Sequence, residues 1–473
     1  MNKLFVILFF PLLGSAQPAF FEKIWGTGGA DQARSVKQLS DGNIYVAGFS
    51  DSGTFGGIDI SLSKIDESGN LLWIKYYGDG ADNFGLYLNK TNDGNLIITG
   101  ERQSFNGTQV DAFAYKIDTA GIVLWNKIYA TPLNESFKYV EQTFDNGYIF
   151  CGFRNDAFGY NDTYVMKTNS VGDSSWSVMV GGTDNDYSDA VHQLPDSTYL
   201  VTGDTRSIGM GNYDVELTHL DSTGQQLWDL PYGDQWANGC QGVFLNSSGN
   251  YLSFGETVIF NNSPFDFYLE EIDTSGTSLW RQTFGGANAD AIFSIIETSD
   301  KGYLFTGYSN SYSSGPLDLV VARTDSDGIM QWIRTYGGTG IDIGYEILHA
   351  RDNGVIIAGT TNDSVTFDSQ YYLLHLDEAG LLTEIKEVDH ENDLSVWPNP
   401  NNGSFNIHCE NFGGQAELNI YSTDGKLVQH NSLIAKNSRI SLSENLPQGV
   451  YFTEVRNGKR TKHCRIVVIR APF

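Results

Sequence analysis

The chain repeats one short segment at an almost constant spacing. The segment reads DESGNLLW at 66–73 and returns five times with its turn glycine and tryptophan, then once as DEAGLLTE at 377–384. The seven glycines stand at positions 69, 121, 172, 224, 276, 328 and 380, so each step is 51 or 52 residues. A fixed period of this length indicates a repeat architecture and outweighs local propensity.

Each repeat reads as four short strands. In the second unit these are 85–94, 95–100, 111–118 and 120–129, with Gly, Asp and Asn turn signals between them and no helical period. Four strands in one repeat are typical of a β-propeller blade, whereas solenoid repeats are usually shorter, about 20–30 residues. We therefore predict an all-β, seven-bladed β-propeller over residues 17–388. A β-sandwich array and a β-solenoid are the alternatives.

The two ends of the repeat region do not match. FFEKIWG at 20–26 reads as a fourth strand without the first three, and 381–388 lacks the aromatic residue of the other fourth strands. We predict that the N-terminal strand completes the last blade, which closes the ring and leaves only short edges. The alternative is that 381–388 closes its own blade. The recurring tryptophan is predicted to pack between neighbouring blades.

The N-terminus and the charge indicate an exported protein. Residues 1–16 place one lysine before a short apolar run and small residues, which predicts a secretory signal peptide. No stretch reaches the ~18 apolar residues of a membrane span, so no transmembrane segment is expected. The chain carries 29 basic and 57 acidic residues, a net charge of -28, which disfavours nucleic acid as a partner.

A polar residue recurs ten positions after each fourth-strand aromatic residue. The series is Asp31, Asn83, Glu135, Asp186, Asn238, Asp290 and Asp342. These connections gather on one propeller face, so one hypothesis is a rim that binds a cation or a polyhydroxylated ligand. The alternative is turn capping, in which each side chain accepts backbone N–H bonds. Trp236 departs from the repeat and is a candidate sugar-stacking platform, with packing as its alternative.

A second acidic series opens the third strand of the repeats, on the same predicted face. It comprises Asp59, Asp111, Asp162, Asp214, Asp266 and Asp318. The eight histidines form no HExxH motif, and the chain has no Gly-x-Ser-x-Gly elbow, P-loop or calcium EF loop. We therefore predict no catalytic residues, no metal site and no cofactor. Because carboxylates are numerous, a glycan hydrolase with two of them on the channel face remains the alternative.

The composition changes after residue 388. A polar linker at 389–394 precedes alternating strands and tight turns at 395–473, which predict a small antiparallel β-sandwich. Its motif residues are Pro398, Asn399, Pro400, Gly403, Gly425, Gly449 and Tyr451. Cys409 and Cys464 both fall in this domain, and either a disulfide or two buried thiols is compatible with the sequence.

These motifs closely resemble the Ig-like type A C-terminal sorting domain of the type IX secretion system, and the repeats look like propellers of secreted Bacteroidetes proteins. The Asp-x-x-Gly-x-x-x-Trp spacing also resembles the tryptophan-docking repeat of quinoprotein propellers, without an identifiable quinone pocket. The sorting-domain resemblance implies export by that machinery, then release or attachment to the cell surface. We predict a binding or adhesion module for an extracellular glycan or protein, with the hydrolase as the alternative.

Overall fold

The computed structural model describes the chain in two parts. It describes residues 20–382 except 54, 105, 106, 108, 211, 212, 234–237, 259–263, 274, 275 and 363–367. Beyond these it describes 394–397, 404–409, 414–422, 426–435, 438–443, 446, 449–457 and 460–468. The chain forms two compact units, Met1–Glu384 and Ile385–Phe473.

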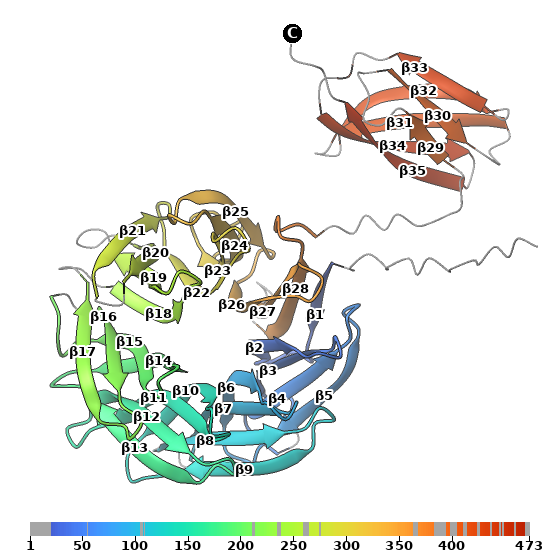
Figure 1. Cartoon of the computed structure of the whole chain (residues 1–473). Coiled ribbons are helices and arrows are strands. Elements are labelled where there is room, and N and C mark those ends of the chain that lie inside the picture. The colour runs from blue at the N-terminus through green and yellow to red at the C-terminus, as the bar shows by residue number, and fades with distance from the viewer. Residues whose placement is uncertain are drawn as a thin grey trace, which may run out of the picture. The chain divides into compact units, whose positions relative to one another are not determined.

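Seven four-stranded antiparallel sheets follow one another around a ring in the first unit (Figure 1). Blade 1 contains β2 (Gln32–Gln38), β3 (Ile44–Ser50), β4 (Asp59–Ile65) and β5 (Leu71–Tyr77). Blade 2 contains β6 (Asn83–Lys90), β7 (Leu96–Gln103), β8 (Val110–Ile117) and β9 (Val123–Tyr129). Blade 3 contains β10 (Glu135–Gln142), β11 (Tyr148–Asn155), β12 (Asn161–Thr168) and β13 (Ser174–Val180).

The remaining blades repeat this order. Blade 4 contains β14 (Asp186–Gln193), β15 (Tyr199–Thr205), β16 (Asp214–Leu220) and β17 (Gln226–Tyr232). Blade 5 contains β18 (Asn238–Leu245), β19 (Tyr251–Val258), β20 (Phe265–Ile272) and β21 (Ser278–Phe284). Blade 6 contains β22 (Asp290–Glu297), β23 (Tyr303–Ser309), β24 (Asp318–Thr324) and β25 (Met330–Tyr336). The predicted seven-bladed propeller is confirmed.

Blade 7 is built from both ends of the repeat region. Its sheet order is β1-β28-β27-β26, with β1 (Phe21–Trp25), β26 (Asp342–His349), β27 (Val355–Asn362) and β28 (Ser369–Leu376). The register runs from Phe21 opposite His375 to Trp25 opposite Tyr371. Blade 7 also contacts blade 1, because β2 lies against β27. The predicted closure by the N-terminal strand is therefore confirmed; residues 383–388 lie outside the described part.

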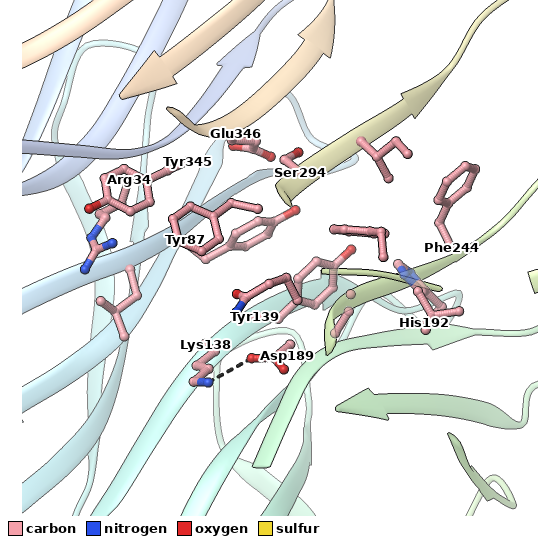
Figure 2. A pocket seen from close by; sticks show the side chains of 18 residues that line it. Arg34, Tyr87, Lys138, Tyr139, Asp189, His192, Phe244, Ser294, Tyr345 and Glu346 are labelled. Carbon is pink, nitrogen blue, oxygen red and sulfur yellow. Dashed lines mark hydrogen bonds and ion pairs between the residues drawn. The ribbon is translucent and has the colours of Figure 1, made fainter. Parts of the chain in front are cut away.

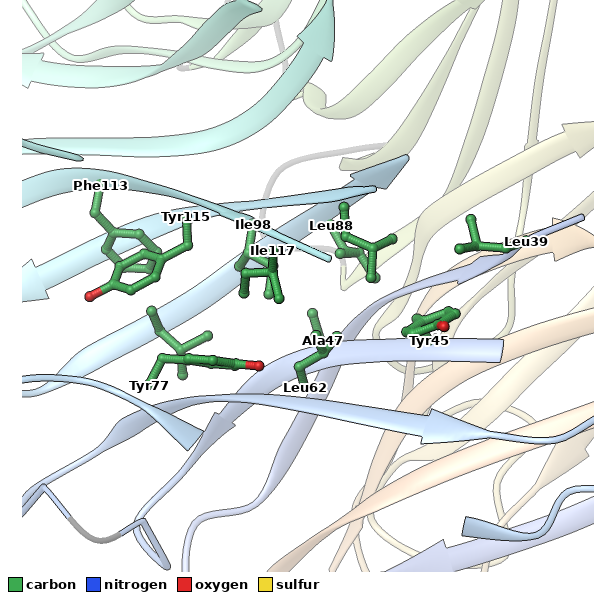
Figure 3. Packing of buried hydrophobic residues seen from close by; sticks show 12 residues of the cluster. Leu39, Tyr45, Ala47, Leu62, Tyr77, Leu88, Ile98, Phe113, Tyr115 and Ile117 are labelled. Atoms are coloured by element: carbon green, nitrogen blue, oxygen red, sulfur yellow. The ribbon is translucent and has the colours of Figure 1, made fainter. Parts of the chain in front are cut away.

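The core lies between the blades. Seven clusters of buried hydrophobic side chains each draw from two neighbouring sheets. Between blades 1 and 2, for example, Tyr45 and Leu62 pack with Leu88 and Phe113, and all four side chains are fully buried (Figure 3). Because each sheet packs both faces against its neighbours, the middle strands are buried over most of their length instead of on alternate residues.

The recurring tryptophan and glycine meet across these interfaces. An added Cβ on Gly224, in a turn of blade 4, would lie 2.7 Å from Cε3 of Trp176 in blade 3. The Trp176 ring also packs edge-on against Tyr199 at 5.7 Å between centroids. The predicted interblade position of the tryptophans is confirmed, although each indole is half-buried and not enclosed.

The second unit consists of two antiparallel sheets and fits the predicted small β-sandwich. One contains β29 (Leu394–Trp397), β30 (Ser404–Cys409) and β33 (Ser438–Ser443); the other is ordered β32 (Leu427–Ala435), β31 (Gly414–Ser422), β34 (Gly449–Asn457) and β35 (Arg460–Val468). Leu418, Ile420, Leu446 and Tyr451 are buried.

Several predicted features fall on residues that the structure does not describe. They are the signal peptide at 1–16, most of the linker at 389–394, and the motif residues Pro398, Asn399, Pro400, Gly403 and Gly425. The side chains of Cys409 and Cys464 also lie outside the description, so their disulfide stays a prediction. Cys151 and Cys240 are buried free cysteines.

Candidate functional site

Each innermost strand is interrupted by a bulge at the same position. The register against the second strand skips one residue, for example between Ala33 and Ser35 in blade 1 and between Ser188 and Ala190 in blade 4. A bulge changes the direction in which a side chain points. The seven bulge residues, named here the bulge ring, are Arg34, Leu86, Lys138, Asp189, Gln241, Phe293 and Tyr345.

The bulge ring lines one cavity in the centre of the propeller (Figure 2). All seven innermost strands contribute to a cavity of about 390 Å³. In six of the seven strands, the residue directly after the bulge residue also lines this cavity. Ligand sites in proteins commonly occupy about 300–1,000 Å³. The centre of the ring is therefore large enough for a small ligand or for the end of a larger one.

One side of the cavity is aromatic. The rings of Phe293 and Tyr345 stack at 5.6 Å between centroids with an interplanar angle of 5°. The guanidinium of Arg34 lies 4.1 Å from the Tyr345 ring centroid, a cation–π distance. Farther round, the Tyr87 and Tyr139 rings approach to 4.5 Å, and burial raises the pKa of Tyr87 well above its usual value.

Some charged groups on the wall serve to join blades. Glu346 of blade 7 accepts hydrogen bonds from Ser35 Oγ and Val36 N of blade 1, both at 2.6 Å, and forms an ion pair with Lys37. Glu141 of blade 3 bonds His192 Nδ1 of blade 4 at 2.8 Å. Because their oxygens already have partners, these carboxylates are not available to a ligand without breaking an interblade contact.

Two other charged side chains each have one polar atom without a hydrogen-bond partner among the described residues. Lys138 Nζ lies 2.8 Å from Asp189 Oδ1, while Asp189 Oδ2 has no partner in the described structure although its side chain is only 10% exposed. Burial, which lowers the pKa of Lys138, is outweighed by Asp189, so that pKa is raised. Arg34 Nε is also buried without a hydrogen-bond partner among the described residues. Buried polar groups are normally paired, so both positions need a ligand or water.

Two further carboxylates stand next to Asp189. Asp204 on β15 accepts a hydrogen bond from Cys240 N, and its pKa is raised well above its usual value by burial and by Asp189. Burial and Asp189 likewise raise the pKa of Glu256 to about 7. Asp189 and Asp204 thus share one ammonium group, Lys138, and a further cation on this side would stabilise the ionised forms of the carboxyls.

The predicted ligand series lies elsewhere. Asp31, Asn83, Glu135, Asp186, Asp290 and Asp342 are all buried, at the start of the innermost strands. Asp31, Asp186, Asp290 and Asp342 accept backbone N–H bonds from the residue four positions earlier at 2.9–3.1 Å. Glu135 instead bonds Thr131 Oγ1, and Asn83 donates to Ala81 O at 2.7 Å. The four aspartates thus make the turn-capping contacts considered above, whereas Glu135 and Asn83 make other local bonds.

Ligand binding by that series stays a prediction. Asn238 opens β18, but its side chain lies outside the described structure, and so does Trp236. The six described members do not line the central cavity. The structure therefore gathers a different set of side chains, the bulge ring, around the centre of the propeller.

The third-strand aspartates explain the first glycine of the Gly-Gly pairs at 181–182 and 285–286. An added Cβ on Gly181 would lie 2.3 Å from Asp162 Oδ1 and 2.7 Å from Asp186 Oδ2. The two carboxylates face the same glycine from neighbouring blades, and only a residue without a side chain leaves room for both. Burial, together with Asp186, raises the pKa of Asp162 to about 6.

The recurring residues of the repeat do not predict the bulge ring. Its members stand three positions after the capping series, and in the seven repeats this position holds Arg, Leu, Lys, Asp, Gln, Phe and Tyr. A position that varies inside a constant repeat is the signal that could have found them.

Within the described residues, no cluster of three or more His, Cys, Asp or Glu side chains is suited to a metal, and no helix has the length and apolarity of a membrane span.

Solved structures resemble the chain in shape at low identity. They include the Neurospora crassa Pan2 WD40 domain (13% identity, 61% of this chain and 87% of that chain, TM-score 0.38), BBS1N bound to ARL6DN (10%, 78% and 100%, 0.42) and a fungal alcohol oxidase in complex with copper (11%, 94% and 99%, 0.45). At these scores the likeness carries no argument about activity. No curated protein matches the sequence.

The C-terminal unit matches a known family. Residues 395–469 correspond to the secretion system C-terminal sorting domain, and among its motif residues Gly449 begins β34 while Tyr451 is buried in the same strand. This domain directs export by the type IX secretion system, and it implies an origin in the Bacteroidetes and a place outside the cell or on the outer-membrane surface. The chain is therefore a seven-bladed β-propeller that carries a type IX sorting domain.

Proposed function

We propose that the exported propeller is a non-catalytic binding module whose ligand enters the central cavity and contacts the bulge ring. The observation that carries the proposal is the contrast between constant and variable positions. Capping carboxylates, turn glycines and docking tryptophans recur because every blade needs them to fold. The bulge position recurs in geometry but holds a different side chain in each blade.

The variation at the bulge position is not required by the fold, because the seven blades offer this residue nearly the same surroundings. A propeller that needed only a packed centre would be served by one residue type repeated seven times. Here stacked aromatic rings, a guanidinium whose Nε has no partner and a carboxylate with one unbonded oxygen line one cavity, as far as the described residues show. Apolar surface with a few placed polar groups is the usual composition of a ligand site.

The test is a ligand screen with matched variants. The full chain is applied to a glycan array and to a panel of peptides and extracellular proteins, and each hit is repeated with Tyr345→Ala and with Tyr160→Ala. Tyr345 lines the cavity, whereas Tyr160 is 41% exposed on the loop before β12. We expect Tyr345→Ala to weaken binding at least tenfold and Tyr160→Ala to leave it unchanged.

The competing function, an extracellular glycan hydrolase, is followed in the same screen by measuring product release. Turnover that Asp189→Asn abolishes while the variant keeps the melting temperature of the wild type would favour the hydrolase. A ligand that responds to Tyr160→Ala and not to Tyr345→Ala would place binding outside the cavity and contradict the proposal.

A further inference from the structure

Two charged side chains of opposite sign line the cavity and have incomplete partners among the described residues. Arg34 makes no ion pair in the described part of the chain, and its Nε is buried without an acceptor. Asp189 uses Oδ1 for Lys138 and leaves Oδ2 unpaired. Of the other polar groups on the wall, Glu346 forms an ion pair with Lys37, and His192 Nδ1 bonds Glu141.

These two groups belong to opposite sides of the ring. Arg34 lies on β2 of blade 1 and Asp189 on β14 of blade 4, which is three blades away in one direction and four in the other. Figure 2 shows Arg34 beside Tyr345 and, apart from them, the linked Lys138 and Asp189. Both residues line the same cavity. One wall of the cavity therefore carries Arg34, and the other carries the Lys138–Asp189 ion pair with one carboxylate oxygen that has no partner among the described residues.

The surroundings of the two groups differ. Arg34 is surrounded by aromatic rings, at 4.1 Å from the Tyr345 centroid and 5.6 Å from the Phe49 centroid, which hold it in place without neutralising it. Asp189 has Asp204 and Glu256 as neighbours, and burial, followed by the charge of Asp189, raises the pKa values of both, which favours their protonated forms.

We propose that the cavity binds a zwitterionic ligand, a short peptide with both termini free, whose carboxylate pairs with Arg34 and whose ammonium pairs with Asp189. This inference rests on the proposed function and names its ligand class. Guanidinium groups bind carboxylates through two parallel hydrogen bonds. An ammonium group supplies the donor that Asp189 Oδ2 lacks, and the stacked rings of Phe293 and Tyr345 offer a surface for an apolar side chain.

The experiment removes one charge of the ligand at a time. Isothermal titration calorimetry is carried out on the full chain with Gly-Phe, Gly-Gly-Phe and Gly-Gly-Gly-Phe, each free, N-acetylated and C-amidated, and with free phenylalanine as a separate arm. We expect one peptide length to bind best, because the gap between Arg34 and Asp189 is fixed. Either blocking group is expected to weaken that peptide at least tenfold.

Variants then assign each charge to its partner. Arg34→Gln is expected to bind the free and C-amidated peptides equally, while it still discriminates against N-acetylation. Asp189→Asn should show the reverse pattern. The matched controls are Arg351→Gln and Asp173→Asn, which remove the same charges from exposed surface ion pairs and are expected to behave as the wild type.

The outcomes separate the two proposals. If blocked peptides bind the wild type as well as free ones, the zwitterion inference is overturned, whether or not the variants fold. It is also overturned if both variants fold and neither changes the discrimination. If another ligand from the screen responds to Tyr345→Ala while no peptide binds, the inference falls and the proposed function stands. Tighter binding of phenylalanine than of any peptide would contradict the peptide assignment.

Discussion

Gly224 and Gly249 both adopt a positive φ in tight turns, +85° and +84°, but their surroundings differ. A Cβ on Gly224 would lie within 2.7 Å of the Trp176 ring, whereas a Cβ on Gly249 would meet nothing within 4 Å. Either alanine would cost about 1–2 kcal/mol for the left-handed backbone. The pair therefore separates the backbone requirement of the turn from the docking of tryptophan on it.

We predict that Gly224→Ala lowers the free energy of unfolding by about 1–3 kcal/mol more than Gly249→Ala does, which is the usual cost of overpacking. Urea unfolding followed by tryptophan fluorescence measures both. Equal losses in the two variants would mean that the Gly–Trp contact between blades adds nothing to the requirement for glycine in the turn.

Residue by residue, the sequence predicted the contacts that every blade repeats. The turn glycines, the interblade tryptophans and the capping alternative for residues such as Asp186 follow from local spacing and from the chemistry of turns. The bulge at Asp189 could not be predicted in the same way, because a bulge is defined by the register between two strands and leaves no fixed residue type behind.

At the scale of elements, β1 is the strand on which the ring depends. Phe21 is buried in the cluster between blades 7 and 1, and Trp25 stacks on Tyr371 at 5.3 Å. Without β1, the outer edge of β28 has no partner strand, and unpaired edges promote aggregation. The mismatch between the first and last repeats predicted this closure, because a strand left over at one end matched a strand missing at the other.

We predict that a chain beginning at residue 27 is several kcal/mol less stable than a chain beginning at residue 17, since it loses a buried aromatic residue and the strand that covers β28. Differential scanning calorimetry compares the two. A synthetic peptide of residues 17–27 should restore the melting temperature of the shorter chain by adding a strand, and a scrambled peptide should not. Identical melting temperatures would show that β28 does not need its partner.

For the whole molecule, the carboxylates between blades make stability depend on pH in an unusual direction. Burial raises the pKa of Glu135 to about 7 and, with Asp186, that of Asp162 to about 6. Burial also raises the pKa values of Asp31, Asp59, Asp111, Asp266 and Asp342. The folded state therefore holds protons that the unfolded chain releases, so stability falls as pH rises from about 4 toward 7.

Surface aspartates act in the opposite sense at lower pH. Burial raises the pKa of Asp145, but hydrogen bonds from Lys167 and Thr143 outweigh it and bring the pKa to about 2. Burial likewise raises the pKa of Asp93, but hydrogen bonds from Lys116 and Thr91 outweigh it and lower that pKa below its usual value. Their contribution is present above about pH 4 and is lost below it, as the carboxylates become protonated. The interblade carboxylates and the surface aspartates together place the maximum of the free energy of unfolding near pH 5.

We predict that the melting temperature rises as pH is lowered from 8 to 5.5 and falls again below about pH 4. Repulsion within a chain of net charge -28 would also favour the lower pH, but salt screens it at exposed sites and much less between buried groups. The scan is therefore repeated in 0.5 M NaCl, where a substantial rise should remain. The double variant Glu135→Gln/Asp162→Asn should flatten it, because these amides cannot titrate. If salt abolishes the rise and the double variant keeps it, surface repulsion and not the interblade carboxylates controls the stability of this ring.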